Sequence, residues 1–186
     1  ALRLDRYAAG NLHALATVRV PTPEEEHKRL ESRQREQLKR EVQRVAAQGR
    51  SLLLTQGYRE KKGWWEKRRW QKLLEVLPAW LVERLEVFRR VLEILRSELA
   101  GATTALEKVA PTERPKGLGG LTYEGVEREV GTWDRFENRR QVGSYTGLCG
   151  GISASGQSIR LLSITKHGNA RLRTALIELA WRLVLW

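Results

Sequence analysis

The stretch from Pro78 to about Lys108 carries the clearest periodic signal in the chain. Its apolar residues recur at alternating spacings of four and three, at Leu81, Leu85, Phe88, Leu92, Leu95, Leu99, Ala102 and Leu106. This heptad pattern predicts a long helix with an apolar seam that a single helix cannot bury. We expect the seam to pair with an earlier helix of the same chain in an antiparallel hairpin, with a second copy, or with both.

The earlier helix is expected from Glu24 to about Gln56. Thr22 and Pro23 precede a run of glutamates, which is typical of a helix start because acids favour the positive end of the helix dipole. The first half is nearly all charged and is either a solvated face or a nucleic-acid contact surface. The second half has an apolar seam at Leu38, Val42, Val45 and Leu52. Residues 24–109 are therefore predicted to form a coiled-coil and basic helical region.

Tryptophans and cations are interleaved between Tyr58 and Lys72. The chain has a formal net charge of +12, which favours a polyanionic partner, nucleic acid before membrane. Aromatic rings beside cations suit stacking and phosphate contacts with RNA or single-stranded DNA. The candidate nucleic-acid-binding residues are Lys61, Lys62, Trp64, Trp65, Lys67, Arg68, Arg69 and Trp70. The alternative is that the tryptophans form a core and the cations point outward.

Residues 1–23 are predicted to be the end of an α/β domain. A helix is expected up to Gly10-Asn11, followed by a strand from His13 to Val20. The chain has no methionine and opens in helical rhythm, so we expect it to be a piece of a longer protein.

Several kinds of site and segment are not predicted. No apolar run is long enough to span a membrane. His13 and His27 have no second ligand at metal spacing, so no metal site is expected. The single Cys149 excludes an internal disulfide and is expected to be a small packing residue.

Residues 110–186 are expected to form a second compact helical unit. After the linker 110–116, Gly117-Leu118-Gly119 is similar to the turn of helix-hairpin-helix modules, whose backbone N–H groups face a DNA phosphate. A helix is then expected from an N-cap at Thr122 to Val130.

The last part of the chain combines a small-residue loop with an amphipathic helix. A short helix capped by Asn138 and Gln141 is expected to end at Gly147, and Gly150 to Ser158 is expected to be a loop. Glycine, serine, lysine and asparagine before a helix are residue types that bind phosphate. Asn169 is expected to cap the last helix, whose core face comprises Leu172, Leu176, Leu179 and Leu183.

The same region carries motifs of one family. The matching segments are Gly117-Leu118-Gly119, Trp133-Asp134-Arg135-Phe136, Tyr145-Thr146-Gly147-Leu148, Ser155-Gly156 and Ile164-Thr165-Lys166-His167-Gly168-Asn169 with Leu172-Arg173. In these residues the chain resembles the bridge-RNA-guided DEDD recombinases of bacterial insertion sequences (the IS one-ten family, its eleven-eleven group). The resemblance extends upstream and covers nearly the whole chain, through Leu4-Asp5-Arg6-Tyr7 with Gly10-Asn11, Val18-Arg19-Val20-Pro21 and Arg33-Gln34-Arg35-Glu36-Gln37-Leu38.

The resemblance implies a mainly α fold in three parts. Residues 1–23 would end an RuvC-like α/β domain, residues 24–109 would form a coiled-coil hairpin, and residues 110–186 would be a helical transposase domain. It implies an RNA-guided DNA transposase that cuts and rejoins strands through a covalent phosphoserine, with Ser155 as nucleophile and Ser153 as the second candidate.

The resemblance also implies a cofactor and partners. Mg²⁺ would be held by carboxylates of the RuvC-like domain, so this fragment alone is expected to be inactive. The partners would be donor and target duplex DNA, a guide RNA, and further copies in a dimer or tetramer, in the bacterial cytoplasm and nucleoid. The candidate DNA- or phosphate-binding residues are Lys116, Gly117, Gly119, Arg160, Lys166, Asn169 and Arg173.

The serine loop departs from the family pattern at several positions. Gly150 replaces a proline, Ala154 the first serine of a pair, and Gln157 the second glycine. An alternative function is therefore a non-catalytic DNA- or RNA-binding helical scaffold, in which the serine loop only touches phosphate.

Overall fold

A computed structural model describes residues 2–11, 14, 19–156 and 158–185. Helices make up most of the described residues, which confirms the mainly α fold. The elements in order are α1 (Leu2–Ala8), α2 (Pro23–Thr55), α3 (Lys67–Val76), α4 (Ala79–Val109), α5 (Gly120–Val130), a 3-10 turn (Trp133–Arg135), α6 (Arg139–Thr146), β1 (Gly150–Ser155), β2 (Ser158–Ile164) and α7 (Ala170–Leu185).

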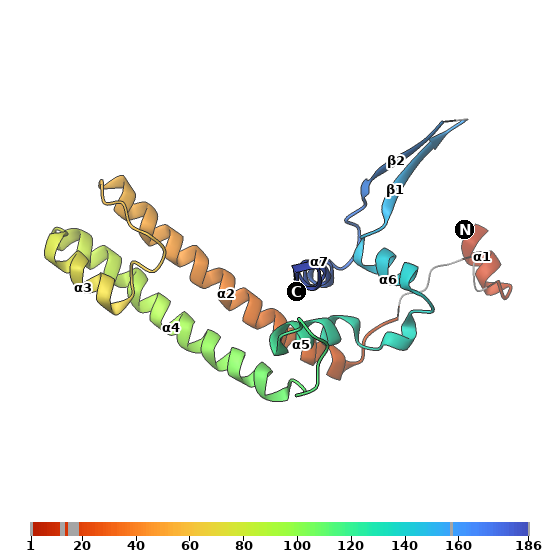
Figure 1. The fold of residues 1–186 in the computed structure, drawn as a ribbon, viewed down its shortest axis with the longest axis horizontal. Coiled ribbons are helices and arrows are strands. Elements are labelled where there is room, and N and C mark those ends of the chain that lie inside the picture. The colour runs from red at the N-terminus through yellow and green to blue at the C-terminus, as the bar shows by residue number, and fades with distance from the viewer. Residues whose placement is uncertain (1, 12–13, 15–18, 157, 186) are drawn as a thin grey trace.

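Helices α2 and α4 run antiparallel and form a long arm with α3 at its far end (Figure 1). The arm core contains Leu81, Leu85 and Leu92 of the predicted seam, packed with Val45 and Leu53 of α2. The expected intramolecular hairpin is confirmed, whereas pairing with a second copy stays a prediction.

The tryptophans of the basic segment belong to this core. Trp64 is 0% exposed, and its Nε1 donates a hydrogen bond to the carbonyl of Ala46 at 2.9 Å. Trp70 is also buried, and Trp65 packs edge-on against Trp64 with 5.8 Å between ring centroids. The prediction that these rings stack on bases is wrong for the buried rings of Trp64 and Trp70, because a base cannot reach them. The core alternative is confirmed.

Most predicted helix ends are close to the observed ones. Thr22 caps α2 in a capping box with Glu25, in which each side chain accepts the other's backbone N–H. Helix α5 starts earlier than predicted, with Gly119 rather than Thr122 as N-cap, because the glycine backbone already adopts the extended cap conformation. Asn138 caps α6 as expected, but Gln141 accepts from the N–H of Glu137 and not from that of Asn138.

The expected loop at Gly150 to Ser158 is instead the start of an antiparallel β-hairpin. Strands β1 and β2 pair directly, and Figure 1 shows the hairpin projecting from the helical body. Gly156 has φ of +57° at the tip, a conformation that glycine adopts without strain. Apolar and polar residues alternate from Ile152 to Ser155 and from Ser158 to Leu161, which is the pattern of a strand and not of a loop.

A second, smaller core lies where α5 meets α7. Val126, Val130 and Leu172 are buried there, with Phe136, Tyr145 and Leu176 packed around them. The predicted core face of α7 is only partly right, since Leu183 is 59% exposed.

The N-terminal segment is described in part. Helix α1 ends before Gly10, as expected, but most of the strand predicted from His13 to Val20 lies outside the described residues. Among the helices that are described, none is both long and apolar enough to cross a membrane.

Candidate functional site

Two motif segments meet at the base of the β-hairpin. The backbone N–H of Thr165 donates to the carbonyl of Cys149, and that of Lys166 donates to Gly147, each at 3.0 Å. The N–H of Asn169 donates to the carbonyl of Tyr145 at 2.9 Å. We call the joined segments 145–149 and 165–169 the hairpin base. Because backbone bonds hold it, the base fixes where the hairpin leaves the body.

Glycines allow the two segments to approach this closely. Gly147 has φ of +69° and caps α6 in the left-handed conformation, and a Cβ there would overlap the backbone of His167. Gly168 has φ of +134°, and a Cβ there would overlap the carbonyl oxygen of Tyr145. Both positions therefore need glycine for conformation and for space.

The hairpin is amphipathic. Ile152 pairs with Leu161 and Ala154 with Ile159, whereas Ser153 pairs with Arg160 and Ser155 with Ser158. Directly opposed residues share a face and successive residues alternate, so the ribbon has an apolar face and a polar face. The polar face, defined as Ser153, Ser155, Ser158 and Arg160, is exposed throughout.

Both candidate nucleophiles thus lie on one surface beside one arginine. Arg160 is directly opposite Ser153 and two pairs away from Ser155, on the same face of the ribbon. Neither serine side chain hydrogen-bonds to any described residue. The surface can present a hydroxyl and a guanidinium to the same phosphate, but no general base is supplied by the described neighbours.

The other expected phosphate ligands are not brought to the serines. Asn169 and Arg173 lie at the hairpin base, and Ser155 is five residues further along β1 than Gly150, or about 17 Å at strand spacing. The structure therefore does not bring all the candidate phosphate-binding residues of this region to one place. Four candidates of this region are cationic or carry an amide: Arg160, Lys166, Asn169 and Arg173. Among them, the structure places only Arg160 beside the serines.

Asn169 and Arg173 are used by the fold itself. The Asn169 Oδ1 accepts the N–H groups of Arg171 and Leu172, each at 3.1 Å, which confirms it as the cap of α7. The Arg173 Nη1 donates to the carbonyls of Thr146 at 2.8 Å and Lys166 at 3.1 Å, both in or next to the base. These two residues hold the base together. Lys166 itself is exposed, with a positive φ of 56°.

The glycine turn before α5 is anchored to the last helix. The carbonyl of Gly117 accepts a hydrogen bond from Arg182 Nη1 at 3.1 Å. Lys116, Gly117 and Gly119 are all exposed, so they stay available as phosphate contacts next to the start of α5.

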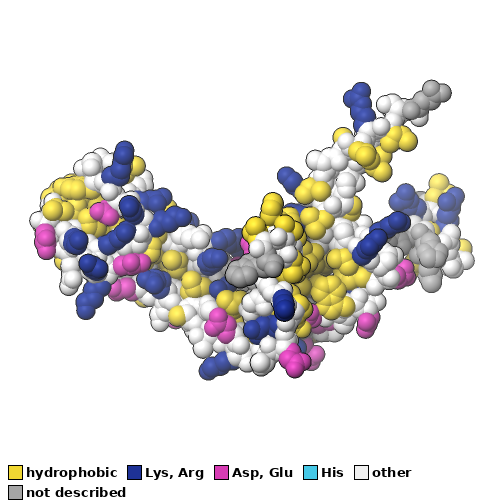
Figure 2. Space-filling model, viewed as in Figure 1, with side chains coloured by type: hydrophobic (Ala, Val, Ile, Leu, Met, Phe, Trp, Pro, Cys, Tyr) yellow, Lys and Arg dark blue, Asp and Glu magenta, His cyan; other side chains and the backbone are white. Residues whose placement is uncertain are grey.

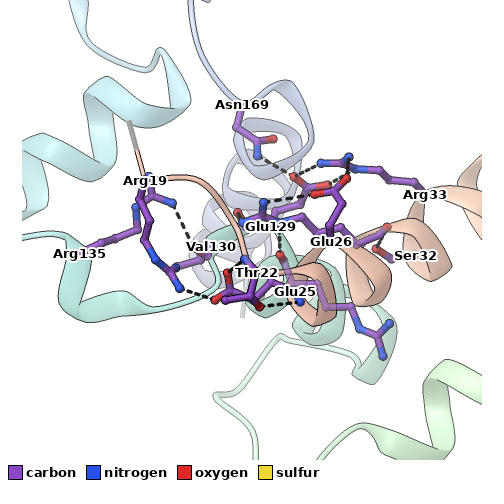
Figure 3. A network of polar contacts seen from close by, with 12 residues as sticks. Arg19, Thr22, Glu25, Glu26, Ser32, Arg33, Glu129, Val130, Arg135 and Asn169 are labelled. Atoms are coloured by element: carbon purple, nitrogen blue, oxygen red, sulfur yellow. Dashed lines mark hydrogen bonds and ion pairs between the residues drawn. The ribbon is translucent and has the colours of Figure 1, made fainter. Parts of the chain in front are cut away.

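A buried carboxylate joins the arm to this domain (Figure 3). Glu129 of α5 accepts from Arg33 of α2, with Nε to Oε1 at 3.1 Å and Nη2 to Oε2 at 3.3 Å. Its Oε2 also accepts from Asn169 Nδ2 at 2.8 Å. Burial acts to raise the pKa of Glu129, but the hydrogen bonds from Arg33 and Asn169 outweigh it and hold the pKa below its ordinary value.

Further contacts between α2 and α5 surround this carboxylate. Arg29 Nε donates to the carbonyl of Arg128 at 2.8 Å, and Arg128 Nη1 donates back to the carbonyl of Lys28 at 2.8 Å. Sequence reasoning missed this junction, since its partners are about a hundred residues apart. Glu129 is one of three charged residues between Val126 and Val130, so the local sequence did not single it out.

No metal centre is formed by the part of the chain that the structure describes. Within it, no group of three or more His, Cys, Asp or Glu side chains is placed to hold an ion. His27 faces Glu31 at 3.6 Å, and Cys149 Sγ lies 3.5 Å from the hydroxyl of Ser144. The described residues therefore do not fit a Mg²⁺ site.

Comparison with known proteins gives consistent matches. Residues 113–186 match the family described as "Transposase IS116/IS110/IS902 family". A protein of Sinorhizobium fredii named as a transposase (y4rJ) is 33% identical over 97% of this chain and 51% of its own length. The transposase for insertion sequence element IS1111A of Coxiella burnetii is 30% identical over 69% of this chain and 39% of its own length.

A second Sinorhizobium fredii protein named as a transposase (y4qE) is 47% identical over 28% of this chain and 14% of its own length. The chain thus spans about half the length, or less, of the curated relatives that it matches. The matched family domain contains α5, the hairpin base, the polar face and α7. The chain belongs to the IS116/IS110/IS902 family of transposases.

Proposed function

We propose that the protein containing this chain is a DNA transposase that cuts and rejoins strands through a serine on the polar face of the hairpin. The observation that carries the proposal is the polar face itself, with Ser153, Ser155 and Arg160 exposed together on a projecting ribbon. A projecting ribbon can reach a phosphate in duplex DNA that a serine inside the helical body could not.

The proposed step is attack of Ser155 Oγ on the phosphorus of a DNA phosphodiester. A bond forms between Oγ and phosphorus, one P–O ester bond breaks, the serine proton passes to a base, and the leaving oxygen becomes a hydroxyl. Arg160 would bind a non-bridging oxygen and stabilise the charge that develops on it. Ser153 is the second candidate, because it lies opposite Arg160 on the same face.

The proposal includes the partners and cofactor of the whole protein. Guide RNA or DNA would contact the exposed cations at the far end of the arm, Lys61, Lys62, Lys67 and Arg68. Mg²⁺ would be held by carboxylates of an RuvC-like domain, since the described residues offer no ligand set. Assembly of further copies through the arm also belongs to the proposal.

The test is a covalent adduct between full-length protein and DNA. Protein is incubated with its guide RNA and labelled duplex DNA, denatured, and examined for labelled protein by gel and mass spectrometry. Ser155→Ala should abolish the adduct, whereas Ser158→Ala, the matched control on the same face, should keep it. An adduct that survives both Ser155→Ala and Ser153→Ala would show that neither serine is the nucleophile.

A second candidate function is supported by one observation. The candidate serine side chains hydrogen-bond to no described residue, so no acid or base contacts them there, which suits a scaffold that binds nucleic acid without cutting it. Tight binding of DNA and RNA by wild-type protein, with no adduct under any metal condition, would favour this scaffold.

A further inference from the structure

A groove runs between the base of the arm and the transposase domain. It has a volume of about 670 Å³ and is lined by α2, α5 and α7. Small residues, among them Gly125 and Ala170, leave it open, and Arg35, Lys39 and Arg40 stand on its α2 side. The groove is not lined by the candidate nucleophiles or by the candidate phosphate-binding residues named above.

Positive charge is in excess in the groove, because each acid is neutralised by an ion pair and two cations are not. Its three acids each have a cation: Glu36 pairs with Arg171 at 2.8 Å, Glu129 with Arg33 at 3.1 Å, and Glu178 with Arg182 at 3.9 Å. Lys39 and Arg40 are exposed and form no ion pair within the described part of the chain. Arg40 Nε donates to the carbonyl of Glu36 in the same helix at 3.4 Å, which leaves its charge unneutralised. The charges of both side chains can therefore meet an anion.

The size of the groove limits the anion. Pockets of about 300–1,000 Å³ take ligands of drug size, which corresponds to one or two nucleotides and not to a duplex. Lys and Arg side chains also gather over the arm that leads away from the groove (Figure 2). A strand that leaves the groove along the arm would therefore meet further cations.

We propose that this groove binds a single nucleic-acid strand, with Lys39 and Arg40 on successive phosphates and the floor around Gly125 against a sugar or base. The inference rests on the proposed function only for the class of partner, and not for the strand chemistry. Two bound phosphates would neutralise the two charges that the acids of the groove leave without an ion pair.

The test measures binding of full-length protein to labelled oligo-uridine, oligo-thymidine and a DNA duplex over a range of salt. Lys39→Ala with Arg40→Ala should lower the log–log salt slope for single strands by about 1.4, because each lost phosphate contact contributes about 0.7. The matched control is Arg84→Ala with Arg90→Ala, two exposed cations of α4 outside the groove. The RNA and DNA oligomers show which strand is preferred.

A steric variant tests the groove without changing charge. A Cβ at Gly125 meets nothing within 4 Å, so Gly125→Leu should fold and fill the groove. We expect it to weaken single-strand binding about tenfold, because the leucine side chain would take the space of a sugar or base on the groove floor. Circular dichroism and thermal melts confirm that each variant is folded.

Three outcomes would overturn the inference. The first is that both groove variants bind single strands with the same affinity and salt slope as the wild-type protein. The second is an equal loss of duplex and single-strand binding, and the third is displacement of the strand by poly-glutamate as effectively as by RNA. A further result is that the protein binds strands through Lys39 and Arg40 and yet forms no adduct with DNA. That result would support strand binding in the groove and would contradict the proposed attack by serine.

Discussion

Gly49 of α2 lies directly against the buried indole of Trp64. A Cβ added at Gly49 would overlap the six-membered ring of Trp64, whose edge sits on the helix backbone. The same indole donates its N–H to the carbonyl of Ala46, one turn earlier in α2. A glycine inside a long helix is ordinarily unfavourable, and here it makes room for the tryptophan that closes the end of the arm.

Gly49→Ala should therefore destabilise the protein, although alanine is the better helix former. Overpacking a filled core costs about 1–3 kcal/mol, which exceeds the gain in helix propensity of about 1 kcal/mol. The free energy of unfolding from urea melts followed by tryptophan fluorescence measures the change. Gly101→Ala in α4 is the matched control, because a Cβ there meets nothing within 4 Å, and it should stabilise the protein. If both alanines stabilise the protein, Trp64 does not pack on Gly49.

At the far end of the arm, the lysines should affect nucleic-acid binding and the tryptophans should affect stability. Lys61 and Lys62 are exposed, so Lys61→Ala with Lys62→Ala should change stability by less than about 0.5 kcal/mol. The same pair should lower the salt slope of single-strand binding by about 1.4. Trp70→Ala should instead cost about 3–5 kcal/mol of stability, since the ring is buried. Unchanged binding in the lysine pair would remove this surface from the proposed contacts.

The hairpin base should depend on Gly168. Gly168→Ala places a Cβ against the carbonyl oxygen of Tyr145 in a backbone conformation that L residues rarely adopt. We expect a loss of about 1–3 kcal/mol and faster amide exchange at Lys166 and Asn169, whose N–H groups bond across the base. Gly143→Ala in α6, where a Cβ meets nothing within 4 Å, is the control and should leave exchange unchanged.

Local patterns predicted the helices well because each depends on neighbours in sequence. The seam through Leu81 and Leu92 and the cap at Thr22 follow from spacing alone. The burial of Trp64 could not be predicted this way, because it depends on an absent side chain at Gly49. The cations beside Trp64 and Trp70 suggested that the rings bind nucleic acid. Most of these cations are exposed, but the two rings are buried.

The sequence contained a partial signal for the hairpin and no local signal for the contacts of the buried carboxylate. The alternation of Ile159, Arg160 and Leu161 was visible, but the small residues of β1 read equally well as a loop. The serines were found from the family motif and not from geometry. The partners of Glu129 lie 96 and 40 residues away in sequence, so no local pattern could bring Arg33 and Asn169 to it.

Glu129 should make stability depend on acid. Glu129→Gln removes the charge from hydrogen bonds with Arg33 and Asn169, and hydrogen bonds to charged groups contribute about 1.5–3 kcal/mol. At pH 7 the variant should be less stable by about that amount. Glu98→Gln, an exposed carboxylate of α4, is the matched control and should have little effect.

The difference between wild type and Glu129→Gln should shrink as pH falls. The pKa of Glu129 is lowered in the folded protein from its ordinary value of 4.5, so the unfolded chain takes up the proton first. The stabilisation is therefore complete above about pH 5 and is lost as pH falls below 4.5 through the folded pKa. The pKa of Glu25 is lowered too, by hydrogen bonds from the backbone N–H of Thr22 and from Arg19, but Glu25 is present in both proteins and cancels in the difference. Urea melts of both proteins between pH 7 and pH 3 measure the difference, and a gap that widens on acidification would mean that Glu129 is protonated in the fold.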